Sequence, residues 1–171
     1  MAQDRRRVHR RNSKDVVSVE PSVPHDLGCM SRAKVGKLHF CKERVNGDYY
    51  QRLLLKEVPL SMAWLGIENA LWVQDNAPAH RHKKSKELLA SMGLRDMGHP
   101  PNSPDLNPIE SVWGEMKRRL AAQRVSSLSD LKAKLNEIWL SLSDEYIARL
   151  VDSMPRRLET VLQQRGGYTK Y

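Results

Sequence analysis

The chain carries two motifs that decide its fold, Gln74-Asp75-Asn76-Ala77-Pro78-Ala79-His80 and Ser103-Pro104-Asp105-Leu106-Asn107-Pro108-Ile109-Glu110. The first motif follows the apolar run 70–74, which is typical of a buried strand that ends in a polar turn. In the second motif, Asn107, Pro108 and Glu110 stand where an N-cap, a first helical residue and a first-turn acid are expected. The two acids that could share a site, Asp75 and Glu110, are separated by 34 residues.

The apolar pattern around these motifs predicts an α/β fold with a helical C-terminal flank. Short strands are expected at 16–19, 37–41, 70–74 and 94–97, and helices at 48–57 and 81–92. From Pro108 onward we expect helices only, with an interruption at Pro155 because proline cannot continue a helical hydrogen-bond ladder. Residues 1–28 are predicted to be a basic, partly disordered segment, and residues 29–171 to be the catalytic-type domain.

Composition indicates a soluble globular chain with an anionic partner. The chain has 171 residues, 40% hydrophobic and 29% charged, and a formal net charge of +9, which is a statement about partners rather than about fold. Three separated basic clusters fit the phosphate backbone of DNA. The DNA-binding candidates within these clusters are Arg5, Arg6, Arg7, Arg10 and Arg11, then Lys83 and Lys84, then Lys117, Arg118 and Arg119. The alternative is a basic tail that serves solubility alone.

Several classes of protein find no support in the sequence. Cys29 and Cys41 form no disulfide framework, and no apolar run reaches the length of a membrane span, so no membrane partner is expected. No glycine-rich nucleotide loop and no serine-hydrolase motif occurs, so no small-molecule substrate is expected. His80, His82 and His99 lack further ligands at zinc-site spacing.

Asp75 and Glu110 are candidate ligands of Mg²⁺ or Mn²⁺, because hard carboxylate oxygens suit these ions. Each acid also has a structural interpretation. Asp75-Asn76 is common turn chemistry, and Glu110 could complete a capping box with Asn107. Asp105 could be a turn residue, and Trp113 a core residue rather than a stacking platform for bases. The residues alone leave these alternatives open.

Extended to Ser111-Val112-Trp113-Gly114, the two motifs resemble the catalytic domain of Tc1/mariner-type transposases, and their spacing fits the Tc1-like subgroup. The resemblance implies a ribonuclease-H-like mixed sheet flanked by helices, and a DDE triad that binds two Mg²⁺ or Mn²⁺ ions. It further implies cut-and-paste DNA transposition in the nucleus, with DNA as partner and a homodimer as the assembly. Asp75 becomes the second acid of the triad and Glu110 the third. The residues that support the motifs are Asn76, His80, Asp105, Asn107 and Trp113.

The sequence departs from the family at the first acid, which in the family lies on the first strand of the sheet. Asp4, Asp15 and Asp26 have no suitable strand-end context. We therefore expect the chain to begin downstream of that strand and the sheet to lack it. The predicted protein is a transposase remnant in which strand cleavage is lost or impaired. The alternatives are a non-catalytic, transposon-derived DNA-binding protein and a chain without a stable fold.

Overall fold

In the computed structural model, residues 16–22, 26–68, 70–101 and 103–164 are described, with the backbone alone at 16–22 and 26. Five strands form one sheet in the order β3-β2-β1-β4-β5. The strands are β1 (Val16–Ser22), β2 (Asp26–Met30), β3 (Val35–Phe40), β4 (Leu71–Gln74) and β5 (Arg95–Asp96).

The sheet is mixed, and β1 is its central strand. β1 pairs antiparallel with β2 and parallel with β4, while β2–β3 is antiparallel and β4–β5 is parallel. The expectation that the sheet lacks its first strand is therefore wrong. The short run 16–19 was a recognisable strand, but only its pairing with β2 and β4 shows that it is the centre of the sheet. The sheet also begins upstream of residue 29, where the domain was expected to start.

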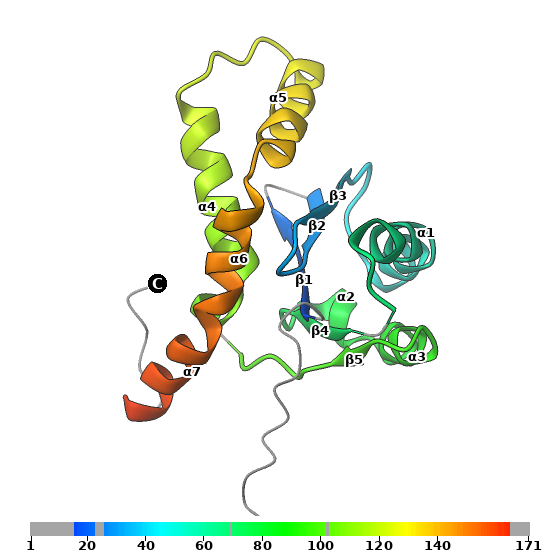
Figure 1. Cartoon of the computed structure of the whole chain (residues 1–171). Coiled ribbons are helices and arrows are strands. Elements are labelled where there is room, and N and C mark those ends of the chain that lie inside the picture. Colours follow the sequence, from blue (N-terminus) through cyan, green and yellow to red (C-terminus); the bar gives the residue numbers. More distant parts are fainter. Residues whose placement is uncertain (1–15, 23–25, 69, 102, 165–171) are drawn as a thin grey trace, which may run out of the picture.

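Helices cover both faces of the sheet (Figure 1). On one face lie α1 (Gly47–Leu65), α2 (Pro78–Arg81) and α3 (Lys83–Ser91). The other face carries α4 (Pro108–Ala121), α5 (Leu128–Leu140) and α6 (Asp144–Asp152), and α7 (Met154–Gln163) follows α6. None of the helices within the described ranges is long and apolar enough to cross a membrane.

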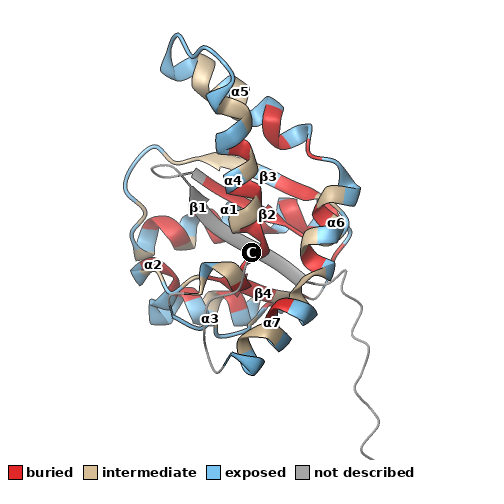
Figure 2. Cartoon of the chain, turned by 90° about the vertical axis from the view of Figure 1, so that its left-hand side faces the viewer, coloured by how far each residue is buried: buried red, intermediate tan, exposed pale blue. Residues whose placement is uncertain are grey.

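The sheet separates two hydrophobic cores. Figure 2 shows buried segments both on the strands and on the helices around them. Tyr50 and Trp72 belong to the core on the α1 side, whereas Trp113 and Trp139 belong to the core on the α4 side. Trp113 and Trp139 stack with ring centroids 5.2 Å apart. They pack so closely on β2 that a Cβ added at Gly28 would lie 2.6 Å from the Trp113 ring. A side chain at position 28 would therefore collide with the core.

The helix ends follow local sequence signals, with one exception in α1. The Asn46 side chain accepts a hydrogen bond from the Tyr49 amide at the start of α1, and Gly66 ends the helix at φ +67°. We predicted this helix only to residue 57, but it continues through Pro59 to Leu65. Buried residues on both sides of the proline pack against the same core, and this tertiary packing offsets the lost hydrogen bond.

Candidate metal centre

Strand β4 presents Asp75 to the α4 side of the sheet. Gln74 lies on the opposite side, where its Oε1 accepts hydrogen bonds from the Tyr50 hydroxyl at 2.7 Å and the Trp72 indole at 3.1 Å. Successive residues of a strand point to opposite faces, so the residue after Gln74 turns towards α4. Asp75 thus leaves the buried strand end on the face where Glu110 also lies.

The carboxylate of Asp75 is held from one side. His80 Nδ1 donates to Oδ1 at 2.6 Å, and the Ala77 amide donates to the same oxygen at 2.9 Å. The His80 side chain is 1% exposed and packs at 4.5 Å from the Tyr50 ring, whereas the Asp75 side chain is 40% exposed. Among the described residues, Oδ2 has no hydrogen-bond partner. One oxygen of Asp75 is therefore fixed, and the other remains available to a ligand.

These contacts determine the charge of Asp75. Burial acts to raise the pKa of its carboxyl group, but the hydrogen bonds from His80 and from the Ala77 amide outweigh this effect. The pKa of Asp75 consequently lies below its usual value. Asp75 is ionised at neutral pH, as a metal ligand must be.

Glu110 occupies the first turn of α4 without serving as a cap. Asn107 is at the N-cap position, but its side chain makes no capping bond, and its own amide donates to the Pro104 carbonyl at 3.0 Å. A capping box would need that amide for the Glu110 carboxylate. The capping interpretation of Glu110 is therefore wrong, and its half-buried carboxylate is free of this structural task.

Asp75 and Glu110 line one pocket of about 350 Å³. The pocket has three walls, which are the end of β4, the proline-rich residues 99–101 and 103–104, and the first turn of α4. The lining residues are Asp75, Asn76, Ala77, His99, Pro100, Pro101, Ser103, Pro104 and Glu110. The structure thus brings together the two acids that the sequence predicted.

The proline-rich wall is braced against the first motif. The Asn76 side-chain amide donates to the His99 carbonyl at 2.7 Å, and His99 Nε2 donates to the Ser103 carbonyl at 2.8 Å. Gly98 precedes this wall at φ +66°, a conformation that favours glycine. From the sequence, His99 was weighed only as a zinc ligand, and its position in this pocket was not predicted. The only local sequence signal for a rigid segment at this position was its prolines, Pro100, Pro101 and Pro104.

Of the five supporting motif residues, only Asn76 lines this pocket; His80, Asp105, Asn107 and Trp113 do not. Asp105 belongs to the short 3₁₀ turn η2 (Pro104–Leu106), and its carbonyl accepts a hydrogen bond from Arg157 in α7 at 2.8 Å. Trp113 is 2% exposed and stacks on Trp139. Trp113 is therefore a core residue, and it cannot serve as a stacking platform for bases.

The first strand supplies no aspartate to this site. β1 and β4 pair with Val19 opposite Gln74, so the next backbone position on β1, Glu20, runs beside Asp75. The sequence of β1 is Val-Val-Ser-Val-Glu-Pro-Ser. The strand expected to be missing is thus present, and its residues 16–22 include no aspartate. Among the residues with described side chains, no three His, Cys, Asp or Glu come together as a metal-binding group.

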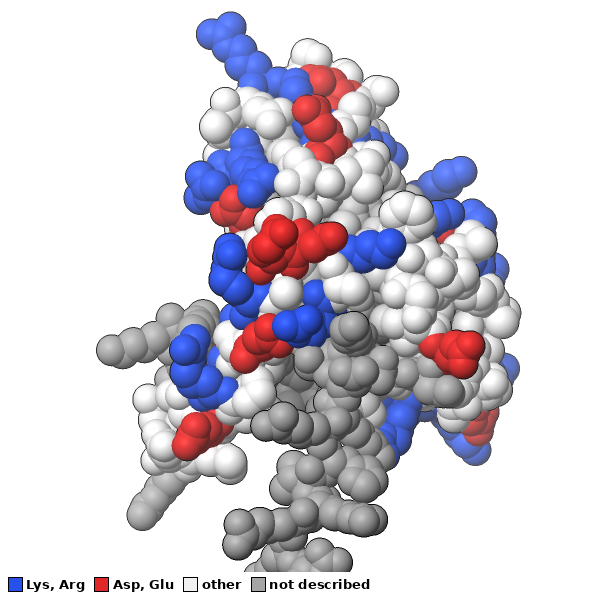
Figure 3. Space-filling model, in the orientation of Figure 1, with Lys and Arg blue, Asp and Glu red and all other residues white. Residues whose placement is uncertain are grey.

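The predicted DNA-binding residues differ in how far they are engaged. Arg5, Arg6, Arg7, Arg10 and Arg11 lie outside the described residues. In α4, Arg118 and Arg119 contact Glu115 at 2.8 and 2.7 Å, and these bonds lower the pKa of Glu115 to about 2. Lys84 and Lys117 are exposed and have no ion-pair partner among the described residues. On the side of the molecule that faces the viewer in Figure 3, basic and acidic side chains are interleaved and do not form one uniform basic patch.

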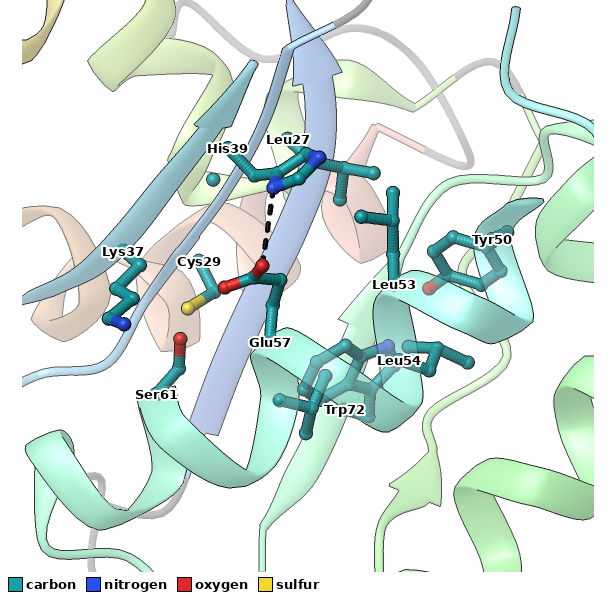
Figure 4. A pocket seen from close by; sticks show the side chains of 12 residues that line it. Leu27, Cys29, Lys37, His39, Tyr50, Leu53, Leu54, Glu57, Ser61 and Trp72 are labelled. Atoms are coloured by element: carbon teal, nitrogen blue, oxygen red, sulfur yellow. Dashed lines mark ion pairs between the residues drawn. The ribbon is translucent and has the colours of Figure 1, made fainter. Parts of the chain in front are cut away.

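A second, smaller pocket lies on the opposite face of the sheet, between β2, β3 and α1 (Figure 4). Its volume of about 40 Å³ has room for about one water molecule. His39 Nδ1 and Glu57 Oε1 lie 3.4 Å apart at this pocket, and burial lowers the pKa of His39, which disfavours the charged imidazolium. Burial also raises the pKa of the Cys29 thiol. Apolar core residues make up most of the remaining wall. This pocket is separate from the Asp75–Glu110 site.

Comparison with known proteins agrees with this geometry. The sequence model of the DDE superfamily endonucleases matches residues 26–132. The Tcb1 transposase of Caenorhabditis briggsae is 32% identical over 160 residues, and the Tc1 transposase of Caenorhabditis elegans is 30% identical over 158 residues. Each alignment covers 88% of this chain and 58% of the relative, so the chain spans little more than half the length of these proteins.

The solved structures give the same fold. The catalytic domain of Mos1 transposase, solved with raltegravir and Mn, superposes with a TM-score of 0.84 at 23% identity. The match covers 92% of this chain and 86% of that domain, which confirms the ribonuclease-H-like architecture. A second structure of that domain, with Mg, gives a TM-score of 0.81. The chain belongs to the DDE superfamily endonucleases. Within them, its domain is of the Tc1/mariner transposase type.

Proposed function

We propose that this chain binds DNA and holds a Mg²⁺ or Mn²⁺ ion between Asp75 and Glu110, with strand cleavage and transfer impaired. The observation that carries the proposal is the convergence of the two motif acids in one pocket, without a third acid among the described side chains. The proposal of a metal ion follows from the two carboxylate donors and from the family. The proposal that strand cleavage is impaired follows from the lack of a third acid beside them among the described side chains.

The residues present fit a divalent cation. Oδ2 of Asp75 has no partner among the described residues, and the Glu110 carboxylate has no cap to make. Both supply hard oxygen donors, and the pocket leaves room for water and a phosphate oxygen. A bound ion there would supply charge neutralisation at a phosphate and activation of a water molecule. His80 orients the Asp75 carboxylate. The hydrogen bond from Asn76 to the His99 carbonyl shapes the wall of the pocket. The N-terminus of α4 favours the ionised form of Glu110.

The impairment follows from the number of ligands. The family's triad holds two ions, and two-ion catalysis stabilises both the attacking and the leaving oxygen of an in-line displacement. Two carboxylates provide too few fixed donors to position two ions. Loss of a single group that stabilises a transition state costs on the order of 10²–10³ in rate in other enzymes, and a similar loss is expected here.

DNA binding rests on charge rather than on the metal pocket. The chain carries a net charge of +9, and Arg5, Arg6, Arg7, Arg10 and Arg11 precede the sheet. Lys84 and Lys117 add exposed cations on the folded domain. Such a distribution binds phosphates without sequence specificity and with strong salt dependence. We propose the nucleus as the location, in keeping with a DNA partner, and an assembly of two copies, since Mos1 transposase has been solved as a paired-end complex.

Incubation with supercoiled plasmid and Mn²⁺ tests the cleavage claim. The wild-type chain should nick DNA no faster than the Asp75→Ala and Glu110→Ala variants, whereas electron paramagnetic resonance should detect Mn²⁺ binding by the wild type alone. Robust nicking that disappears in both variants would overturn the impairment. A Glu20→Gln variant belongs in the same series, because Glu20 is the one acid on β1. If it also abolished nicking, the first strand would supply the third ligand.

A non-catalytic DNA-binding protein is the second candidate function. It is favoured by the absence of a three-acid group among the described side chains. Mn²⁺ binding separates the two candidates, and fluorescence anisotropy with duplex DNA at several salt concentrations checks the DNA binding that they share. If DNA affinity is the same for the wild type and Asp75→Asn, and the wild type binds no Mn²⁺, the pocket has no metal function and only the DNA-binding function remains.

A further inference from the structure

The segment that carries Glu110 is fastened from the far end of the chain by a buried arginine. Arg157 lies in the first half of α7 and is 2% exposed. Its Nη1 donates to the Asp105 carbonyl at 2.8 Å, and its Nε donates to the Ser153 hydroxyl at 2.8 Å. Arg157 therefore ties the start of α7 to the η2 turn, five residues before Glu110.

The same arginine reaches the residue that follows Glu110. Arg157 Nη2 lies 3.4 Å from the Ser111 hydroxyl, and the Tyr146 hydroxyl of α6 donates to the Ser111 carbonyl at 3.2 Å. Contacts from α6 and α7 thus fall on both sides of Glu110, at residues 105 and 111. We use the name α7 clamp for the four residues joined by these contacts, which are Asp105, Ser111, Tyr146 and Arg157.

The guanidinium group suits this task better than other side chains would. Its planar donors have a fixed geometry, so one side chain can hold a carbonyl and a hydroxyl at a set separation. Hydrogen bonds from a charged donor are also stronger than neutral ones. Because the group is buried, water does not compete for its acceptors. These contacts join η2 and the first turn of α4 to α6 and α7.

We infer that Arg157 is a positioning residue for Glu110: it fixes residues 105–111 so that the Glu110 carboxylate faces Asp75 across the pocket. The inference rests on the proposed metal site, because the purpose of the fixed position is to hold two carboxylates at one ion. Partners that orient metal ligands from behind are worth about 10–100-fold in metal affinity. Arg157 itself lies outside the pocket lining.

The test uses the full chain with Arg157→Met and Arg157→Lys. Methionine keeps much of the apolar volume without a donor, and lysine keeps the charge but donates from a single atom. The matched control is Arg149→Met, which removes an exposed arginine from α6. Mn²⁺ affinity is measured by electron paramagnetic resonance, and local order by amide hydrogen exchange.

We expect Arg157→Met to weaken Mn²⁺ binding about 10–100-fold, Arg157→Lys to weaken it less, and Arg149→Met to leave it unchanged. Exchange should accelerate at the amides of Leu106, Asn107 and Glu110, which bond within this segment, but not at Ala77, which bonds to Asp75. This local pattern is a readout that general destabilisation would not produce.

Three results would count against the inference. Unchanged exchange at residues 106–110 in both Arg157 variants would show that the α7 clamp does not fix the segment. Faster exchange with wild-type Mn²⁺ affinity would show that the clamp serves stability alone. If Arg157→Met unfolds α7, the Arg157→Lys variant provides the test. Equal Mn²⁺ affinity in Arg157→Lys and the wild type would then refute the claim that Arg157 positions Glu110. A wild-type chain that binds no Mn²⁺ would overturn the proposed function, and the exchange data would still decide whether Arg157 fixes the segment.

Discussion

The contact between His80 and Asp75 offers the sharpest test of how this site is built. His80→Phe keeps an aromatic ring beside Tyr50 but removes the donor that lies 2.6 Å from Asp75 Oδ1. Asp75 then keeps one of its two hydrogen bonds, the one from the Ala77 amide. We expect the pKa of Asp75 to rise towards its usual value and Mn²⁺ affinity to fall about 10–100-fold.

The magnitude for stability follows from the exposure of the pair. A hydrogen bond to a charged group contributes about 1.5–3 kcal/mol to folding. Because 40% of the Asp75 side chain is exposed, solvent screens the interaction, and we expect a loss near the lower end, about 1.5 kcal/mol at pH 7. The pKa of Asp75 is lowered in the folded state, so its contribution is complete above the unfolded-state pKa and is lost as pH falls through the folded-state pKa.

Urea unfolding at pH 7 and at a series of lower pH values measures this difference. The gap in unfolding free energy between wild type and His80→Phe should narrow as the pH falls through the folded-state pKa of Asp75, because the protonated carboxyl group no longer accepts a charge-assisted hydrogen bond from His80. His82→Phe is the matched control, because His82 is exposed and two residues away, and it should behave as wild type. An equal gap above and below the folded-state pKa of Asp75, or an equal loss in the control, would refute the reasoning.

Three further predictions follow from other contacts. Glu110→Gln should weaken Mn²⁺ binding and destabilise the fold by no more than about 0.3–1 kcal/mol, because the carboxylate makes no cap and interacts only with the helix N-terminus; a larger loss of stability in thermal unfolding would contradict this. Gly28→Ala should destabilise the fold by about 1–3 kcal/mol in urea unfolding, because its Cβ would meet Trp113 at 2.6 Å; wild-type stability would mean that the core can yield. Lys84→Ala should reduce the salt dependence of DNA binding by about 0.9 in log–log slope, and Arg118→Ala by less because Glu115 already binds that arginine; the reverse order would refute the assignment.

Much of the candidate site could be predicted because its signals are local. Asp75 follows an apolar run, and Glu110 stands three residues after Asn107, so both positions follow from a strand end and a helix start. The residues of the two motifs, together with the 34-residue separation of the two acids, also indicated the family. The helix that starts at Pro108 was equally local, and so was the interruption near Pro155, which the structure places at Ser153, with Pro155 in the first turn of α7.

The remaining features depend on residues far apart in the chain. The local pattern found a short strand at 16–19, yet its central place depends on pairing with β2 and β4. The capping interpretation of Glu110 failed because the Asn107 amide has another acceptor, the Pro104 carbonyl. The continuation of α1 past Pro59 needed a core supplied by the sheet. No periodicity in the sequence carries this information.

The sequence by itself determined the family, the two acids and the basic character, because motif chemistry and net charge are properties of neighbouring residues and of composition. Only the tertiary structure decided that Asp75 and Glu110 share a pocket and that the first strand is present without an aspartate. It also showed that Arg157 reaches back to Asp105. The physical reason is that strand register and long-range hydrogen bonds are fixed by packing between distant segments, which one-dimensional patterns do not encode.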